Sequence, residues 1–210
     1  MPIGEDRIGR DLRRYQLAMR LVAHEARTGT ICDWTGLTRE RLKTLRREWG
    51  IPTETRHRGP SPTSVSVFFR SPRARSEASL LAMLCRMMGA VSSTRIPDAV
   101  RLLPSLDRGE RLCDAFEAFR VCLPESPVEF EQVVLLALAL AQGDALELGH
   151  CKNCDAIILI DRLSVVRCIC SFCHRDVGQR TSMDEATVAA AGPDDSAADE
   201  RSTGQQGSLF

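Results

Sequence analysis

The sequence predicts a mainly α-helical protein with a helix-turn-helix near its N-terminus and a small C-terminal module organised by four cysteines. Aromatic residues make up only 5% of a chain that is 43% apolar, so its core must consist of Leu, Val, Ala and Met. That composition suits packed helices better than a β-sandwich. Apolar residues recur at helical spacing in several segments, and two closely spaced cysteine pairs lie between residues 151 and 173.

The first predicted helix covers residues 8–27. Its apolar residues recur at steps of four and three, and the stripe that they form is either part of the core or a seam for a partner helix. Gly29 follows as a natural helix stop. The stripe consists of Ile8, Leu12, Tyr15, Met19, Val22 and Ala26.

A helix-turn-helix is predicted within a helical region that covers residues 1–50. A short first element at residues 31–34 precedes a turn that contains Gly36. Thr38 is a good N-cap for a second helix, which runs to about Trp49 because glycine and proline follow it.

This second helix has an apolar face beside a basic face. In a helix-turn-helix, the first turns of the second helix enter the major groove of DNA. We therefore expect Arg39 and Lys43 to contact base edges, and Arg46 and Arg47 to contact phosphates. A solvated amphipathic helix would show the same pattern, so the helix alone does not decide between the two interpretations.

Charge is unevenly distributed although the net charge is zero. Residues 1–75 contain 16 basic and 8 acidic residues, whereas residues 176–210 contain 2 basic and 7 acidic residues. Arginine supplies 26 of the 28 basic residues, and its planar guanidinium can form paired hydrogen bonds to phosphate and guanine. A GC-rich genome would also raise the arginine content, but it would not cluster the charge. The clustering favours a polyanionic partner such as DNA.

The middle of the chain alternates between proline-rich and helical segments. Residues 51–75 are predicted to be a basic, Pro-rich connector with one short strand near residues 65–69, and residues 76–148 a helical core or oligomerisation region. Residues 176–210 lack spaced apolar positions and are predicted to be a disordered acidic tail. The predicted helices of the middle region are residues 73–88, 111–122 and 128 to about 148.

Two C-x2-C pairs, with 15 residues between them, have the spacing of a tetrahedral zinc site. A gap of two residues allows both thiolates of one tight turn to reach a single ion. Four thiolates leave no coordination position for water, so the predicted ion is structural, one per chain, within a zinc-ribbon-like module at residues 149–175. The predicted ligands are Cys151, Cys154, Cys170 and Cys173.

Other cysteines and histidines are weaker candidates for metal ligands. Cys168 could replace Cys170, but the two-residue gap favours Cys170, and His150 and His174 are interpreted as bystanders. Disulfides and unliganded buried thiols are the alternatives to a metal site. The remaining cysteines, which lie in or beside apolar patterns, are predicted to be small core residues: Cys32, Cys85, Cys113 and Cys122.

Motifs of common enzyme classes are missing from the sequence, which lacks H-E-x-x-H, a Walker loop and G-x-S-x-G. We therefore predict that the protein is not an enzyme. The first thirty residues contain no apolar signal region, and the longest apolar run, residues 133–141, is far shorter than the ~20 residues of a membrane span. The predicted location is the cytoplasm.

The sequence resembles the flagellar transcriptional activator FlhC between about residues 11 and 175. The resemblance rests on YQLAMRL at residues 15–21, GLTRERL at residues 36–42, the pattern of two cysteine pairs, and the order of the parts. It implies a transcriptional activator of flagellar and other operons that binds promoter DNA with FlhD-like subunits, two FlhC-like chains with four FlhD-like chains. It also implies the same four zinc ligands and leaves Cys168 unassigned. The alternative is a zinc-ribbon adaptor that acts only through protein–protein contacts.

Overall fold

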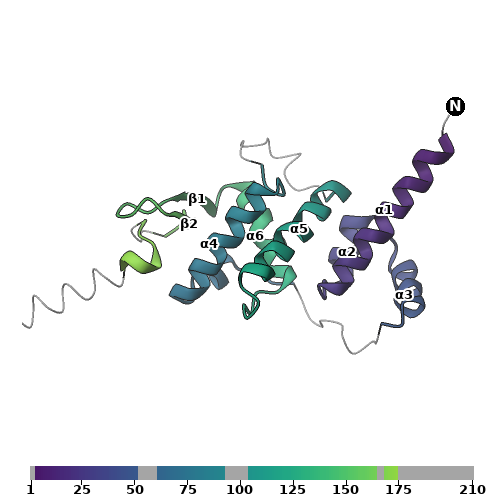
Figure 1. Cartoon of the computed structure of the whole chain (residues 1–210), viewed down its shortest axis with the longest axis horizontal. Coiled ribbons are helices and arrows are strands. Elements are labelled where there is room, and N and C mark those ends of the chain that lie inside the picture. Colours follow the sequence, from purple (N-terminus) through teal and green to yellow (C-terminus); the bar gives the residue numbers. More distant parts are fainter. Residues whose placement is uncertain (1–2, 52–60, 93–103, 165–167, 175–210) are drawn as a thin grey trace, which may run out of the picture. The chain divides into compact units, whose positions relative to one another are not determined.

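The computed structural model describes residues 3–51, 61–92, 104–164 and 168–174 (Figure 1). The predicted acidic tail at residues 176–210 and part of the predicted connector lie outside these ranges. Within them, the protein is mainly helical, as the composition predicts, and it also contains a two-stranded sheet that was not predicted. None of the described helices combines the length and the hydropathy that crossing a lipid bilayer requires.

Three helices form the N-terminal part of the fold: α1 (Ile3–Ala23), α2 (Thr28–Thr35) and α3 (Arg39–Glu48). α1 ends before the predicted boundary, and Glu25 has a left-handed φ of 57° in the turn that follows. The expected stop, Gly29, lies instead in the first turn of α2, so that prediction was wrong. A left-handed turn at a residue other than glycine has no strong sequence signal.

The buried face of α1 differs from the predicted stripe. Leu17, Ala18 and Leu21 are buried, whereas Leu12 and Met19 of the stripe are 55% and 50% exposed. Part of the stripe therefore lies on the solvent side of α1, and helical spacing alone did not identify the core face.

The middle of the fold consists of α4 (Pro72–Met87), α5 (Leu106–Cys122) and α6 (Phe130–Gln142), which pack against one another (Figure 1). The serines before α4 and α5 each accept a hydrogen bond from a backbone N–H in the first turn, which caps these helices. The 3-10 helix η2 (Val65–Phe69) replaces the short strand that alternation had suggested, and its Phe68 is buried against the helices.

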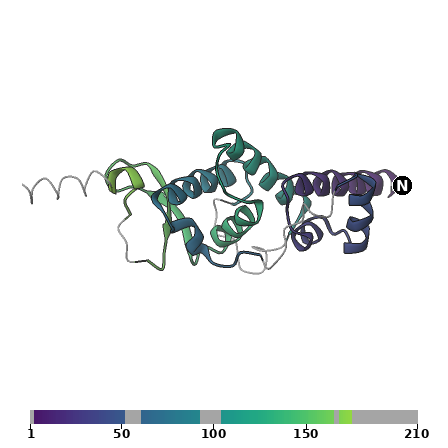
Figure 2. The same ribbon diagram turned by 90° about the horizontal axis from the view of Figure 1, so that it is seen from below.

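α6 ends at Gln142, earlier than predicted, because Gly143 adopts a left-handed conformation with φ of 70°. The chain then forms a β-hairpin of β1 (Leu146–His150) and β2 (Ile157–Asp161), whose antiparallel register pairs Leu146 with Asp161 and His150 with Ile157. The prediction of a helix to about residue 148 was therefore wrong. β2 packs against α4, and Figure 2 shows the green hairpin beside this blue helix.

The larger of two hydrophobic clusters among the described residues contains residues from α1 to β2. Full burial of one large apolar side chain stabilises a fold by about 1.5–3 kcal/mol, so this cluster is the main source of stability. Its largest fully buried side chains include Phe119, Phe130, Leu17, Leu21, Ile31, Leu42, Leu81, Leu112, Leu136 and Leu159.

Paired charges repeat along the contact between α1 and α5. Arg13 bonds to Glu110 and Asp107, and one helical heptad later Arg20 bonds to Glu117 and Asp114. Burial opposes ionisation of Glu117, but hydrogen bonds from Arg20 and His24 hold its pKa below the ordinary value. Each exposed pair contributes little alone, but the repeat fixes the register of the two helices.

A buried carboxylate of α6 substitutes for the missing side-chain cap of α2. Glu131 accepts hydrogen bonds from the Arg27 N–H at 2.8 Å and from the Thr30 hydroxyl at 3.0 Å. The Ser61 hydroxyl also donates to Glu131, at 3.0 Å. The first helix of the α2–α3 pair is thus fixed to α6 by a tertiary contact.

Candidate functional site

The first cysteine pair occupies the turn of the β-hairpin. Cys151 directly follows β1, and its N–H donates to the carbonyl of Ala156 at 2.9 Å. Asp155, with φ of 59°, donates its N–H to the carbonyl of Cys151 at 2.9 Å. These bonds close a tight turn that brings Cys151 and Cys154 onto one side of the hairpin end.

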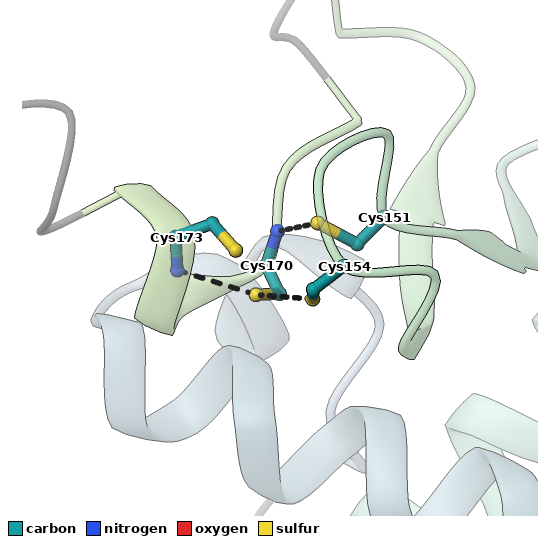
Figure 3. A group of neighbouring side chains, drawn as sticks. All are labelled: Cys151, Cys154, Cys170 and Cys173. Carbon is teal, nitrogen blue, oxygen red and sulfur yellow. Dashed lines mark hydrogen bonds between the residues drawn. The ribbon is translucent and has the colours of Figure 1, made fainter.

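The second pair lies at a short helical turn over residues 171–174. The N–H of Cys173 donates to Cys170 Sγ at 3.3 Å, and the N–H of Cys170 donates to Cys151 Sγ at 3.2 Å. The N–H of Lys152 donates to the carbonyl of Cys168 at 2.9 Å, which fastens the two segments together. Figure 3 shows the four cysteine side chains gathered between the segments.

The sulfur atoms are close enough to bind one ion. All four lie within 4.8 Å of one another, and the sulfurs of Cys154 and Cys170 are 3.6 Å apart. A tetrahedral ion with metal–sulfur bonds of about 2.3 Å requires sulfurs about 3.8 Å apart. The four predicted ligands therefore form a group that could hold one metal ion.

Hydrogen bonding gives the thiols of Cys151 and Cys173 different acidities. The Cys170 N–H that donates to the sulfur of Cys151 lowers the pKa of this thiol to about 6. The pKa of Cys173 is raised to about 12, first by its hydrogen bond with Cys154 and then by that with Cys170. A metal ion that binds these sulfurs would displace the protons of the thiols.

The neighbouring histidines and the fifth cysteine lie outside this group. His150 Nδ1 is 3.1 Å from the carbonyl oxygen of Asp155 and 3.1 Å from its Oδ1, so the ring is held by that residue. Cys168 is partly buried, and His174 is exposed. Among the described residues, the potential metal group consists of the four cysteines of the two pairs.

The basic helix α3 follows α2 after a short glycine-containing turn. Gly36 ends α2 with φ of 70°, and its N–H donates to the carbonyl of Cys32 at 2.8 Å. The predicted N-cap is confirmed: Thr38 Oγ1 accepts from the Arg41 N–H at 3.2 Å. Leu42 and Leu45 are buried, so α3 is anchored by its apolar face.

The four predicted DNA-contacting residues do not share one environment. Arg39, Lys43 and Arg47 are exposed to solvent. Arg46 is only 6% exposed and donates to the hydroxyl of Thr28 at 3.2 Å, which links α3 to the start of α2. The exposed basic surface of α3 therefore contains three of the four predicted residues.

No protein-family model matches this sequence, and no curated protein matches it either. The functional assignment must therefore rest on the residues of the chain.

Sequence reasoning missed one further basic residue of α3. The guanidinium carbon of Arg41 lies 5.4 Å from the ring centre of Tyr15, and its Nε donates to the tyrosine hydroxyl at 3.4 Å. This contact packs the start of α3 against α1. The tyrosine stood in the predicted apolar stripe, but nothing in the sequence indicated its partner.

The cysteines outside the site were mostly predicted correctly. Cys85 and Cys113 are fully buried, and burial raises the pKa of each thiol to about 12. Cys32 is partly buried, but Cys122 is exposed at the last residue of α5. The prediction of Cys122 as a core residue was therefore wrong.

Proposed function

We propose that this protein is a DNA-binding transcriptional activator in which α2 and α3 act as a helix-turn-helix. The observation that carries the proposal is the arrangement of α3: its leucines are buried, while Arg39, Lys43 and Arg47 are exposed along one helix. A helix anchored in this way presents its basic side chains at little entropic cost from the backbone, which suits insertion into the major groove.

We further propose that the activator belongs with the FlhC type and acts on promoters of flagellar and other operons. The support is the sequence resemblance, which also implies FlhD-like partner subunits. The gathered sulfurs support one structural zinc ion per chain, because four thiolates suit zinc and leave no open position for catalysis. In this proposal the ion braces the β-hairpin and does not contact DNA.

Salt-dependent DNA binding tests the proposal. The full-length protein would be titrated onto a fluorescein-labelled duplex of about 30 base pairs of mixed sequence, with anisotropy measured over a series of KCl concentrations. Each phosphate contact steepens the decline of log K with log salt by about 0.9. We expect Lys43→Ala and Arg47→Ala each to weaken binding and to reduce this slope by about 1.

Arg86→Ala is the matched control, because Arg86 is an exposed arginine of α4, away from α3. It should leave the slope unchanged. Equal effects of all three substitutions would assign binding to the general charge of the protein and would refute a role for α3. The absence of DNA binding at low salt would favour the adaptor that acts only through protein contacts.

A further inference from the structure

The solvent side of α4 carries an apolar stripe. Leu80, Met83 and Met87 follow one another at steps of three and four, opposite the buried face of the helix. Leu80 and Met83 are partly buried, and Met87 is among the most exposed large apolar residues of the described chain. An apolar stripe on the solvent side of a helix indicates a surface to which another segment binds.

The end of the β-hairpin and the second cysteine turn form the opposite wall. Ile157 and Phe172 project there with 46% and 74% of their surfaces exposed. Together with Leu80 and Met83 they line a groove with a volume of about 430 Å³. This volume lies within the range of about 300–1,000 Å³ of ligand-binding pockets.

Hydrogen bonds link the two walls of this groove. The hydroxyl of Ser171 donates to the carbonyl of Pro72 at 2.9 Å, and the Ser76 hydroxyl donates to Ser171 at 3.1 Å. The Ser79 hydroxyl accepts from the N–H of Leu159 at 2.9 Å. The hairpin and the second cysteine turn are thus fastened along α4, so the groove between them is preformed.

The charged side chain that lines the groove is positive. Arg75 lines it, and its buried Nε has no hydrogen-bond partner within the described part of the chain. The one acidic residue of α4, Glu77, is buried and bonded to Arg73 and to the hydroxyl of Ser126. The charges that α4 presents to solvent are therefore all arginines.

We propose that this groove binds an amphipathic helix of a partner protein, which seats an apolar stripe between Met83 and Phe172 and pairs an acidic side chain with Arg75. Methionine side chains adapt to apolar partners, and an apolar groove beside a helix is the usual receptor for such a segment. A second copy of this chain fits less well, because a two-fold axis would bring the arginines of two α4 helices together. This inference concerns α4 and the hairpin and goes beyond the DNA-binding function proposed for α3.

A designed peptide tests the groove in the full-length, metal-containing protein. The probe is a fluorescein-labelled helix of about 18 residues with leucines along one face and glutamates elsewhere, and binding is followed by anisotropy. We expect Met83→Glu and Phe172→Ala each to weaken binding by at least tenfold, which corresponds to about 1.4 kcal/mol. Met19→Glu is the control, since it introduces the same charge at an exposed methionine on α1, and it should alter affinity less than twofold.

Charge specificity is tested with the same peptide carrying lysines in place of glutamates. The acidic peptide should bind at least tenfold more tightly, and Arg75→Gln should remove most of that difference. Metal content and circular dichroism confirm that each variant is folded, and DNA affinity should stay unchanged in Met83→Glu. Equal binding of the two peptides, no binding of the acidic peptide, or self-association that Met83→Glu abolishes would each overturn the proposal.

Discussion

Replacing Glu131 with glutamine should destabilise the protein strongly, although the substitution changes few atoms. The buried carboxylate accepts a hydrogen bond from the Arg27 N–H and one from each of the hydroxyls of Thr30 and Ser61. The glutamine oxygen can accept from the Arg27 N–H while its NH2 group donates to the two hydroxyls, which then accept instead of donating. All three bonds nevertheless lose the negative charge that strengthens them, which costs about 1 kcal/mol for each bond. The expected loss is about 2–4 kcal/mol.

Urea denaturation followed by circular dichroism measures this loss. With a slope of about 2 kcal/mol per molar urea, the midpoint should fall by about 1–2 M. Glu110→Gln is the matched control, because Glu110 forms an ion pair with Arg13 near the surface, where such pairs contribute about 0–1 kcal/mol. If Glu131→Gln unfolded within about 0.5 kcal/mol of the control, the capping role of Glu131 would be refuted.

Three further predictions follow from the packing. Gly109→Ala would place a Cβ 2.8 Å from a leucine methyl of α1, so we expect a loss of about 1–3 kcal/mol in urea denaturation; an unchanged midpoint would contradict the close approach of α1 and α5. Because the pKa of Glu117 is lowered in the folded protein, its ionised carboxylate stabilises the fold above the unfolded pKa of about 4.3, and this stabilisation is lost as the pH falls through the folded pKa. Arg20→Ala should therefore make the thermal midpoint fall less steeply in acid, and an unaltered acid profile would refute the coupling. Under native conditions a maleimide should label exposed Cys122 and spare buried Cys85, whose pKa of about 12 keeps it protonated; equal labelling would contradict the described burial.

The sequence was most informative where the structure depends on residues that are close together in the chain. The N-cap at Thr38 and the two C-x2-C pairs are local patterns, because a cap or a cysteine turn acts within a few residues. The metal group of four sulfurs was therefore predictable, as was the mainly helical fold.

The features that the sequence did not predict depend on tertiary contacts. The end of α6 depends on the left-handed Gly143, and the short apolar segment after it suits a strand as well as a helix. Arg46 lies beside basic neighbours in the sequence but is buried against Thr28, which only the placement of α2 reveals. For the same reason, spacing alone could not separate the exposed Leu12 from the core of α1.

The metal-binding capacity of the four gathered sulfurs is the central claim, and native mass spectrometry of the full-length protein with thiol alkylation tests it most directly. The account predicts one metal ion per chain, zinc by preference. Cys151, Cys154, Cys170 and Cys173 should resist alkylation until a chelator removes the ion. A folded protein that binds no metal, and whose four thiols all react at once, would contradict it.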